Sequence, residues 1–123
     1  MAPVPVPPRP LTTAEREVLE SMLSPDFPGA AQLRAQIPHT QVVAVWSPGL
    51  PSVDLSVSAD ADPAPVADGE IPAGSEVRDE AGEYLGEILV WVEDGRLSAL
   101  EYAWVTDDPP HRLPTAAELK IVS

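Results

Sequence analysis

Glu101 is the residue that first raises the question of chemistry. It is a carboxylate in the apolar second half of the segment VWVEDGRLSALEYAW, residues 90–104. A positioned carboxylate or histidine can act as a general acid or base, and burial helps to tune its pKa. His39 lies at the exit of an expected helix. One hypothesis is therefore a small-molecule binder or hydrolase, with its pocket in a sheet–helix groove around Glu101 and His39.

The familiar catalytic and metal-binding patterns are missing from the sequence. Neither His39 nor His111 belongs to a His-Glu-x-x-His pattern, and the chain has no Gly-x-Ser-x-Gly elbow and no glycine-rich phosphate loop. The absence of cysteine excludes thiolate metal sites and a cysteine nucleophile. The acids of residues 58–74 do not have the spacing of a calcium loop. We therefore favour a non-enzymatic protein with no catalytic residue, metal or cofactor.

Two helices are expected near the N-terminus. Thr12 and Glu15 have the spacing of a capping box, in which each side chain accepts a hydrogen bond from a free backbone amide. An apolar stripe follows at helical spacing: Leu11, Ala14, Val18, Leu19, Met22 and Leu23. The pattern predicts an amphipathic helix over residues 12–24 and a shorter helix over 29–36 that ends before Pro38.

After residue 40 the apolar pattern changes to a period of two, which is typical of strands. Segments 41–46, 52–57, 75–80 and the two halves of 85–105 fit this pattern, and a long acidic loop covers 58–74. Helices followed by a run of strands predict an α+β domain. Its two N-terminal helices would pack on one face of an antiparallel meander of about five strands.

The Asp94-Gly95 pair is a strong signal for a two-residue hairpin turn of type I′, which needs positive φ at both positions. An uninterrupted ladder from this turn defines two faces. One face carries Gly86, Ile88, Val90, Val92, Leu97, Ala99, Glu101 and Ala103. The other carries Leu85, Glu87, Leu89, Trp91, Ser98, Leu100, Tyr102 and Trp104. Both faces are largely apolar, which is unusual for a sheet that helices cover on one side only.

The face with small and branched residues is the expected contact with the helices, because small side chains allow close approach. Glu101 then points toward the helical layer, where a buried carboxylate needs a partner or must stay protonated. Arg16, Arg34 and His39 are the candidates for that partner.

The opposite face predicts a partner-binding surface formed by Trp91, Leu100, Tyr102 and Trp104. Large exposed apolar patches mark interfaces, and tryptophan and tyrosine are enriched there. The alternative is that the chain covers this face itself, with the 58–74 loop or one of its terminal segments.

The charge of the chain favours a basic protein as partner. Twenty acidic and seven basic residues give a formal net charge of -13. Such a chain repels nucleic acid and anionic membranes and attracts basic proteins, although acidity also serves solubility alone. The leading hypothesis is a protein-binding domain. It is either an inhibitor or immunity-type protein for a basic partner, or a dimer that pairs its own aromatic faces.

Residues 1–10 contain five prolines and are predicted to be a disordered tail, which leaves residues 11–123 as a single domain. No apolar run approaches the roughly 20 residues of a membrane helix. The N-terminus also lacks the apolar region of a signal peptide. A cytoplasmic location is therefore expected.

Four segments resemble an uncharacterised family of small acidic proteins from high-GC bacteria: DFPGAAQLRAQ (26–36), PSVDLSV (51–57), VEDGRLSALEYAW (92–104) and DDPP (107–110). The resemblance covers most of the chain after the proline-rich segment. Some members carry cysteines just before the PSVDL-like strand, where this chain reads VWSPGL. The resemblance therefore implies one recurring domain and carries over no thiol, metal or other function.

Overall fold

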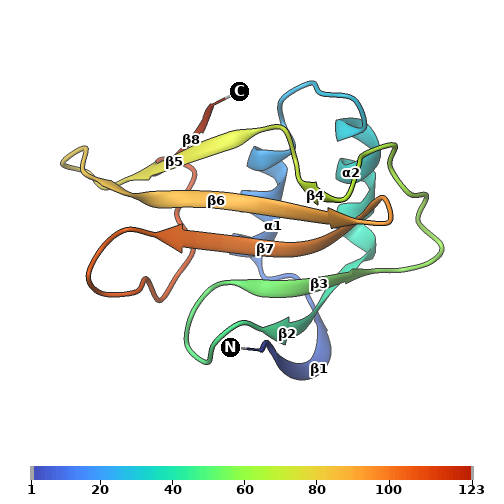
Figure 1. The fold of residues 1–123 in the computed structure, drawn as a ribbon, viewed down its shortest axis with the longest axis horizontal. Coiled ribbons are helices and arrows are strands. Elements are labelled where there is room, and N and C mark those ends of the chain that lie inside the picture. Colours follow the sequence, from blue (N-terminus) through green and yellow to red (C-terminus); the bar gives the residue numbers. More distant parts are fainter. Residues whose placement is uncertain (1, 123) are drawn as a thin grey trace.

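Within residues 2–122, which the computed structural model describes, two α-helices lie on one side of an antiparallel sheet of eight strands (Figure 1). The helices are α1 (Thr13–Met22) and α2 (Ala30–Gln36), and a 3-10 helix, η1 (Ile37–His39), follows α2 directly. The α+β class predicted from the sequence is confirmed. Both helices begin and end within two residues of the predicted bounds.

The sheet has the strand order β1-β2-β3-β7-β6-β5-β8, and β4 also pairs with β6. The strands are β1 (Val4–Pro10), β2 (Thr40–Val45), β3 (Val53–Val57), β4 (Gly69–Glu70), β5 (Gly74–Arg78), β6 (Tyr84–Glu93), β7 (Arg96–Trp104) and β8 (Leu119–Val122). The expectation of about five strands omits β1, β4 and β8. Two of these are very short and the third is rich in proline, so none has a clear alternating pattern.

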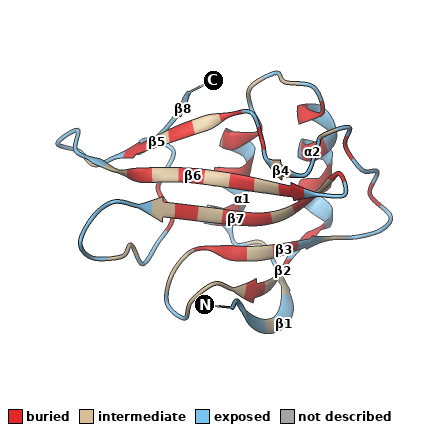
Figure 2. Cartoon of the chain, viewed as in Figure 1, coloured by how far each residue is buried: buried red, intermediate tan, exposed pale blue. Residues whose placement is uncertain are grey.

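The core fills the space between the helices and one face of the sheet. Leu19, Met22 and Leu33 from the helices are fully buried. From the sheet, Val42 and Val90 are fully buried in the same cluster. Figure 2 shows buried residues alternating with partly exposed ones along β6 and β7. This alternation means that the sheet has one covered face and one open face.

The capping box at the start of α1 is confirmed. The Thr12 hydroxyl accepts from the Glu15 amide at 3.1 Å, and the Glu15 carboxylate accepts from the Thr12 amide at 2.8 Å. Each bond satisfies an amide that has no partner within the helix. Two residues three positions apart therefore fix where the helix begins.

Strand β1 corrects the prediction of a disordered tail. Residues Val4–Pro10 pair antiparallel with β2, from Val4 opposite Val45 to Pro10 opposite Gln41. Proline has no amide hydrogen, but an edge strand needs only alternate amides for its single neighbour. The prolines are therefore compatible with this position, and they also protect the edge from pairing with another chain.

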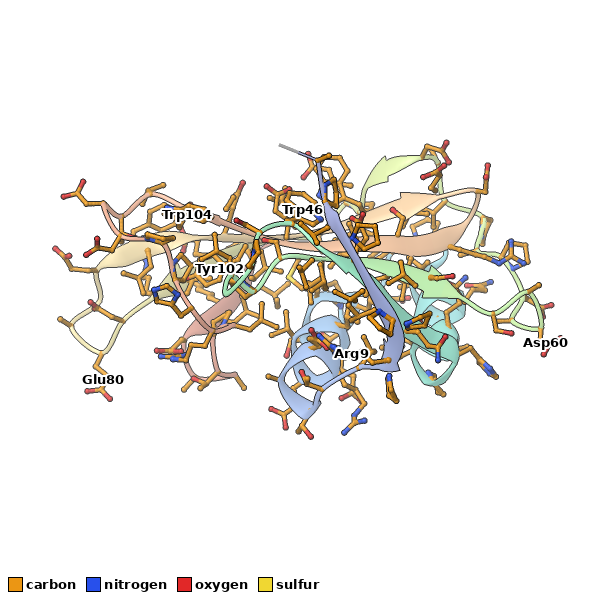
Figure 3. The ribbon with its side chains drawn as sticks, turned by 90° about the horizontal axis from the view of Figure 1, so that it is seen from below. Arg9, Trp46, Asp60, Glu80, Tyr102 and Trp104 are labelled. Carbon is orange, nitrogen blue, oxygen red and sulfur yellow. The ribbon has the colours of Figure 1, made fainter. Side chains whose placement is uncertain are left out.

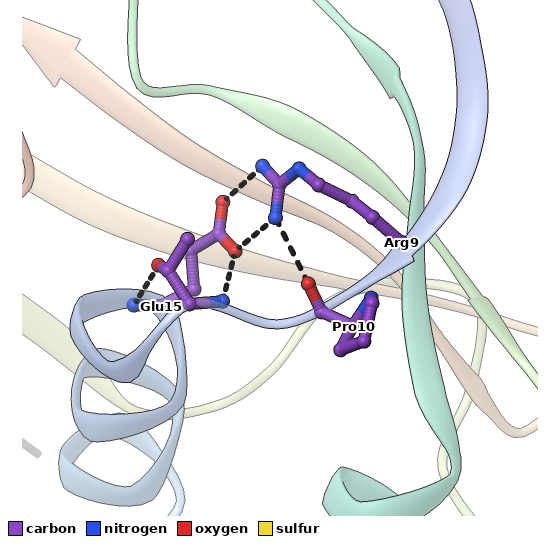
Figure 4. Close-up of polar contacts among 4 residues, drawn as sticks. Arg9, Pro10 and Glu15 are labelled. Atoms are coloured by element: carbon purple, nitrogen blue, oxygen red, sulfur yellow. Dashed lines mark hydrogen bonds and ion pairs between the residues drawn. The ribbon is translucent and has the colours of Figure 1, made fainter.

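Arg9 ties β1 to α1 through the same carboxylate that caps the helix (Figure 4). Its Nη1 and Nη2 donate to Oε1 and Oε2 of Glu15 at 2.9 and 3.0 Å. Glu15 is 5% exposed. Burial by itself raises the pKa of Glu15, but the hydrogen bonds from Arg9 and Thr12 outweigh it, so the pKa is lowered. The ionised carboxylate therefore joins β1 to the first turn of α1.

Arg9→Gln should destabilise the protein by about 1–2 kcal/mol, because Glu15 keeps its buried charge and loses the bidentate hydrogen bonds of the guanidinium group. The partial exposure of Arg9 keeps the cost below that of a fully buried pair. Urea unfolding measures the difference. Arg16→Gln, at an exposed position on α1, is the matched control and should change stability by less than about 0.5 kcal/mol. Equal stability of the two variants would show that the Arg9 contact contributes nothing.

The Asp94-Gly95 turn between β6 and β7 is as predicted, since the two residues have φ of 53° and 74°. It sets the two nearest pairs, Glu93 with Arg96 and Val92 with Leu97, in the expected register. Local turn chemistry therefore determines the first two steps of the ladder.

Beyond those pairs a β-bulge at Ser98 shifts the register by one residue. Trp91 lies opposite Ala99, whereas an uninterrupted ladder would place it opposite Ser98. From Ala99 to Ala103 the faces are exchanged relative to that ladder. Leu100 and Tyr102 are buried, while Glu101 lies opposite Leu89 on the same face as Trp91. The predicted faces of residues 99–103 are therefore wrong, whereas Trp104 at the end of β7 shares a hollow with Trp46 and Glu101.

Burial energetics explain the bulge. An uninterrupted register would direct Glu101 into the core and would leave Leu100 and Tyr102 in solvent. Burying a large apolar side chain contributes about 1.5–3 kcal/mol. An unpaired buried carboxylate costs several kcal/mol. Both effects favour the bulge, which costs only a local interruption of the ladder.

Gln36 at the end of α2 connects the helix to the hairpin turn. The side chain is 1% exposed. Its Nε2 donates to the carbonyls of Asp62 and Gly95 at 3.0 and 2.8 Å, and its Oε1 accepts from the Leu97 amide at 3.1 Å. One buried amide thus satisfies three backbone groups, one from the 58–74 loop, one from the hairpin turn and one from the start of β7.

Gln36→Leu should cost about 2–4 kcal/mol, because the leucine keeps the volume but leaves those backbone groups without a partner. Gln32→Leu makes the same chemical change at an exposed position of α2 and should cost less than about 0.5 kcal/mol. Thermal and urea unfolding of both variants measure the difference. A Gln36 variant as stable as the Gln32 variant would mean that water replaces the lost bonds.

Candidate functional site

The open face of the sheet carries aromatic and acidic side chains together. We call the set Trp46, Asp54, Trp91, Glu101 and Trp104 the aromatic–acidic face. Trp46 follows β2, Asp54 lies on β3, Trp91 on β6, and Glu101 and Trp104 on β7. In Figure 3 the helices lie below the sheet and Trp46 lies above it. Strands that are distant in sequence therefore bring these five residues to one surface.

Two indole–carboxylate hydrogen bonds order this face. The Trp91 Nε1 donates to Glu101 Oε1 at 3.0 Å, and the Trp46 Nε1 donates to Asp54 Oδ1 at 2.8 Å. Each bond satisfies the single polar group of a tryptophan and fixes the orientation of a carboxylate. Among the described residues, the second oxygen of each carboxylate has no hydrogen-bond partner. Both carboxylates can therefore accept a further donor.

Two shallow hollows lie side by side on the face, and Trp46 lines both. The first has a volume of about 320 Å³ and contains Glu101 and Trp104. The second has a volume of about 420 Å³ and contains Asp54 and Trp91. Ser98, the bulge residue, lines the second hollow as well. Bulges change the direction of side chains and often lie next to binding sites. The Ser98 bulge therefore affects the open surface as well as the packing of the core.

The charge on this face is negative. Glu93 lines the second hollow, Glu70 lies opposite Trp91 in the β4–β6 pair, and Glu87 lies opposite Ala103 in the β6–β7 pair. With Asp54 and Glu101 these residues make five carboxylates. No arginine, lysine or histidine is among the described residues that line either hollow. The face therefore attracts cations.

The structure divides the predicted partner-binding set of four residues into two pairs. Trp91 and Trp104 belong to the aromatic–acidic face, and Trp104 is 39% exposed. Leu100 and Tyr102 are 0% and 4% exposed and belong to the core. The Ser98 bulge is the cause, since it exchanges the faces of these two residues with that of Glu101.

Sequence reasoning did not find Trp46 and Asp54 as site residues. A signal was present for each of them. Asp54 alternates with Val53 and Leu55 and so faces away from the core, and Trp46 ends the preceding strand pattern. Their contact depends on the β2–β3 turn, which brings Trp46 beside Asp54.

The 58–74 loop does not cover this face, because it packs against α2 and the hairpin turn. The Ala64 amide donates to the Gly95 carbonyl at 2.7 Å, and Gln36 binds the Asp62 carbonyl. Gly29, at the start of α2, approaches Val66 so closely that an added Cβ would clash with the Val66 side chain. The loop therefore closes the helical side of the domain.

The segment after β7 also lies on the helical side, where it passes behind the sheet toward β8 (Figure 1). Leu113 joins the core from this segment. Burial raises the pKa of Tyr102, and the nearby Glu118 carboxylate raises it further. Arg112 donates to both oxygens of Glu118 at 2.8 and 2.9 Å. This ion pair fastens the segment beside the buried tyrosine.

The Arg112–Glu118 pair predicts an acid-labile contribution to stability. The hydrogen bonds from Arg112 and then from the Thr115 amide lower the pKa of Glu118 to about 2, from its usual 4.5. A lowered folded-state pKa stabilises the fold when the group is ionised. The contribution is therefore complete above pH 4.5 and disappears as the pH falls toward 2.

Glu118→Gln should accordingly lose about 0.5–1 kcal/mol of stability at pH 7, the size of an exposed ion pair. The difference from the unsubstituted protein should shrink as the pH falls from about 4.5 to 2. Urea unfolding across this pH range measures it. Glu80→Gln, at an exposed turn position, controls for the loss of one negative charge. A difference in stability that stays constant down to pH 2 would show that the ion pair with Arg112 does not lower the pKa of Glu118.

Glu101 and His39 do not form a common groove. Glu101 lies on the open face, and its partner is Trp91, not Arg16, Arg34 or His39. His39 ends η1 and lines other hollows, beside α2 and beside β2. The Ser98 bulge again explains the difference, because the predicted register would have directed Glu101 toward the helices.

Among residues 2–122 there is no group of three or more histidine, cysteine or acidic side chains placed to hold a metal ion. Within the same residues, no helix has the length and apolar character needed to cross a membrane. No protein-family model matches the chain, and no curated protein and no solved structure matches it either. What the protein can bind therefore has to be inferred from the geometry of the aromatic–acidic face.

Proposed function

We propose that this protein is a protein-binding domain that uses the aromatic–acidic face to hold a basic protein. The observation that supports the proposal best is the combination of three tryptophans with five carboxylates on an open sheet face. Among residues 2–122, no basic residue lines its two hollows. Tryptophan and tyrosine anchors are typical of interface hot spots. An inhibitor of a basic protein, acting in the cytoplasm, is the form of this function that we favour.

Charge complementarity supports a basic partner. The chain has a formal net charge of -13. An arginine-rich or lysine-rich surface would be drawn to this field, which speeds encounter and disfavours acidic competitors. The tryptophan rings supply apolar area for contact, and they also attract cations to their faces.

The same charges argue against self-association through this face. A symmetric dimer would bring five carboxylates of each copy into one interface. Like charges placed together cost several kcal/mol in an interface, and no basic residue of the described part of the chain lines the hollows to offset them. A partner of opposite charge removes this repulsion.

The proposal is tested by identifying one partner and measuring the direct interaction. Proteins captured from the native host at low salt are identified, purified and titrated against the domain by calorimetry. We expect a basic protein whose affinity falls with rising salt. Trp91→Ala and Trp104→Ala should each weaken its binding by about 2 kcal/mol or more, as hot-spot anchors do.

Tyr84→Ala is the matched control, because Tyr84 has the same 39% exposure as Trp104 but lies outside the hollows. It should leave the affinity unchanged. An acidic or neutral partner would contradict the proposal, and so would a basic partner insensitive to both tryptophan substitutions. Sedimentation of the pure protein should give a monomer, and a dimer broken by Trp104→Ala would replace the proposal with self-association.

A further inference from the structure

We propose that the 320 Å³ hollow between Trp46 and Trp104 is a pocket for one arginine side chain of the partner, with Glu101 as its anchor. This inference rests on the proposed function and names the chemistry of one position within it. The walls of the hollow and the carboxylate inside it both match the chemistry of a guanidinium group.

The walls of the hollow suit a cation on an apolar stem. Trp46 and Trp104 provide two indole rings, whose faces attract cations that come within about 6 Å of the ring centre. Leu50 and Ala103 provide apolar surface for the methylene groups of a long side chain. The lining thus accommodates both parts of an arginine.

Glu101 is already held in place to receive the charge. Its Oε1 accepts from the Trp91 indole at 3.0 Å, and among the described residues its Oε2 has no partner. Because the Trp91 bond fixes the carboxylate, little side-chain entropy is lost when a donor arrives. Ser52, which also lines the hollow, has its hydroxyl engaged by the Tyr102 amide at 2.9 Å. Glu101 is therefore the anion available to a ligand there.

Arginine fits this arrangement better than lysine. A guanidinium is planar and weakly hydrated, so it stacks on an indole while its edge donates to a carboxylate. An ammonium is a compact, strongly hydrated charge, and it would lose more hydration in a hollow with two indole walls. The two indoles of the hollow, together with Glu101 as the one carboxylate among its described lining residues, therefore favour the guanidinium.

The probe is N-acetyl-arginine amide, titrated into the full chain while the three tryptophan indole N–H signals are followed by NMR. The signals of Trp46 and Trp104 should shift in a saturable manner. N-acetyl-lysine amide should bind at least several-fold more weakly. N-acetyl-citrulline amide, which has the same shape without the charge, should produce no saturable shift.

Glu101→Gln should weaken arginine binding about tenfold, since it removes the charge while it keeps an oxygen for the Trp91 indole. Glu93→Gln is the control, because it removes the same charge from the neighbouring hollow. It should change the affinity less than twofold. Equal effects of the two substitutions would show general electrostatic attraction, and they would overturn the pocket.

The outcomes separate this inference from the proposed function. Absence of a saturable shift with the arginine probe overturns the pocket, even if a basic partner binds through Trp91 and Trp104. Equal or tighter binding of the lysine or citrulline probe also overturns it. Specific arginine binding that depends on Glu101 supports the pocket, even if no basic protein partner is found, in which case only the proposed function fails.

Discussion

The cost of burying a carboxylate determines how the central hairpin pairs. β6 and β7 form the middle of the sheet, and every other strand joins the sheet directly or indirectly through them. If Glu101 faced the core, its charge would have to be neutralised there, and Leu100 and Tyr102 would be exposed. The bulge at Ser98 avoids both penalties. The same shift brings Glu101 next to Trp91. One local irregularity therefore places Leu100 and Tyr102 in the core and Glu101 on the open face.

Polar side chains replace the backbone bonds that the irregular pairing gives up. The Ser52 hydroxyl accepts from the Tyr102 amide at 2.9 Å, where β7 extends past its short contact with β3. The Ser75 hydroxyl both accepts from the Ile88 amide and donates to the Ile88 carbonyl, at 2.8 and 2.9 Å. The Gln36 side chain likewise donates to the Gly95 carbonyl in the hairpin turn and accepts from the Leu97 amide. A buried backbone group without a partner costs about 1–3 kcal/mol. The hydrogen bonds from these buried side chains remove that penalty where the strand pairing is incomplete.

The features predicted correctly from the sequence are those that depend on neighbours along the chain. The capping box of Thr12 and Glu15 and the Asp94-Gly95 turn are local, and both are as predicted. The register beyond the turn depends on which face the helices cover, and no local pattern contains that information. Half of the predicted binding set was consequently misplaced. The strand at Val4–Pro10 was missed because proline favours an extended chain, whether or not that chain has a neighbour.

The constraint that shapes the core also limits what can cover the open face. Asp54 and Glu101 are held by indole hydrogen bonds, so they cannot turn away from an incoming surface without breaking those bonds. An apolar partner would remove water from these carboxylates without donating a hydrogen bond to them. This desolvation would cost several kcal/mol for each buried charge. A guanidinium or ammonium group replaces the lost water with a charged hydrogen bond. The fixed carboxylates therefore disfavour apolar partners as well as attract basic ones. A cation can both stack on the indole rings and act as the hydrogen-bond donor to the carboxylates.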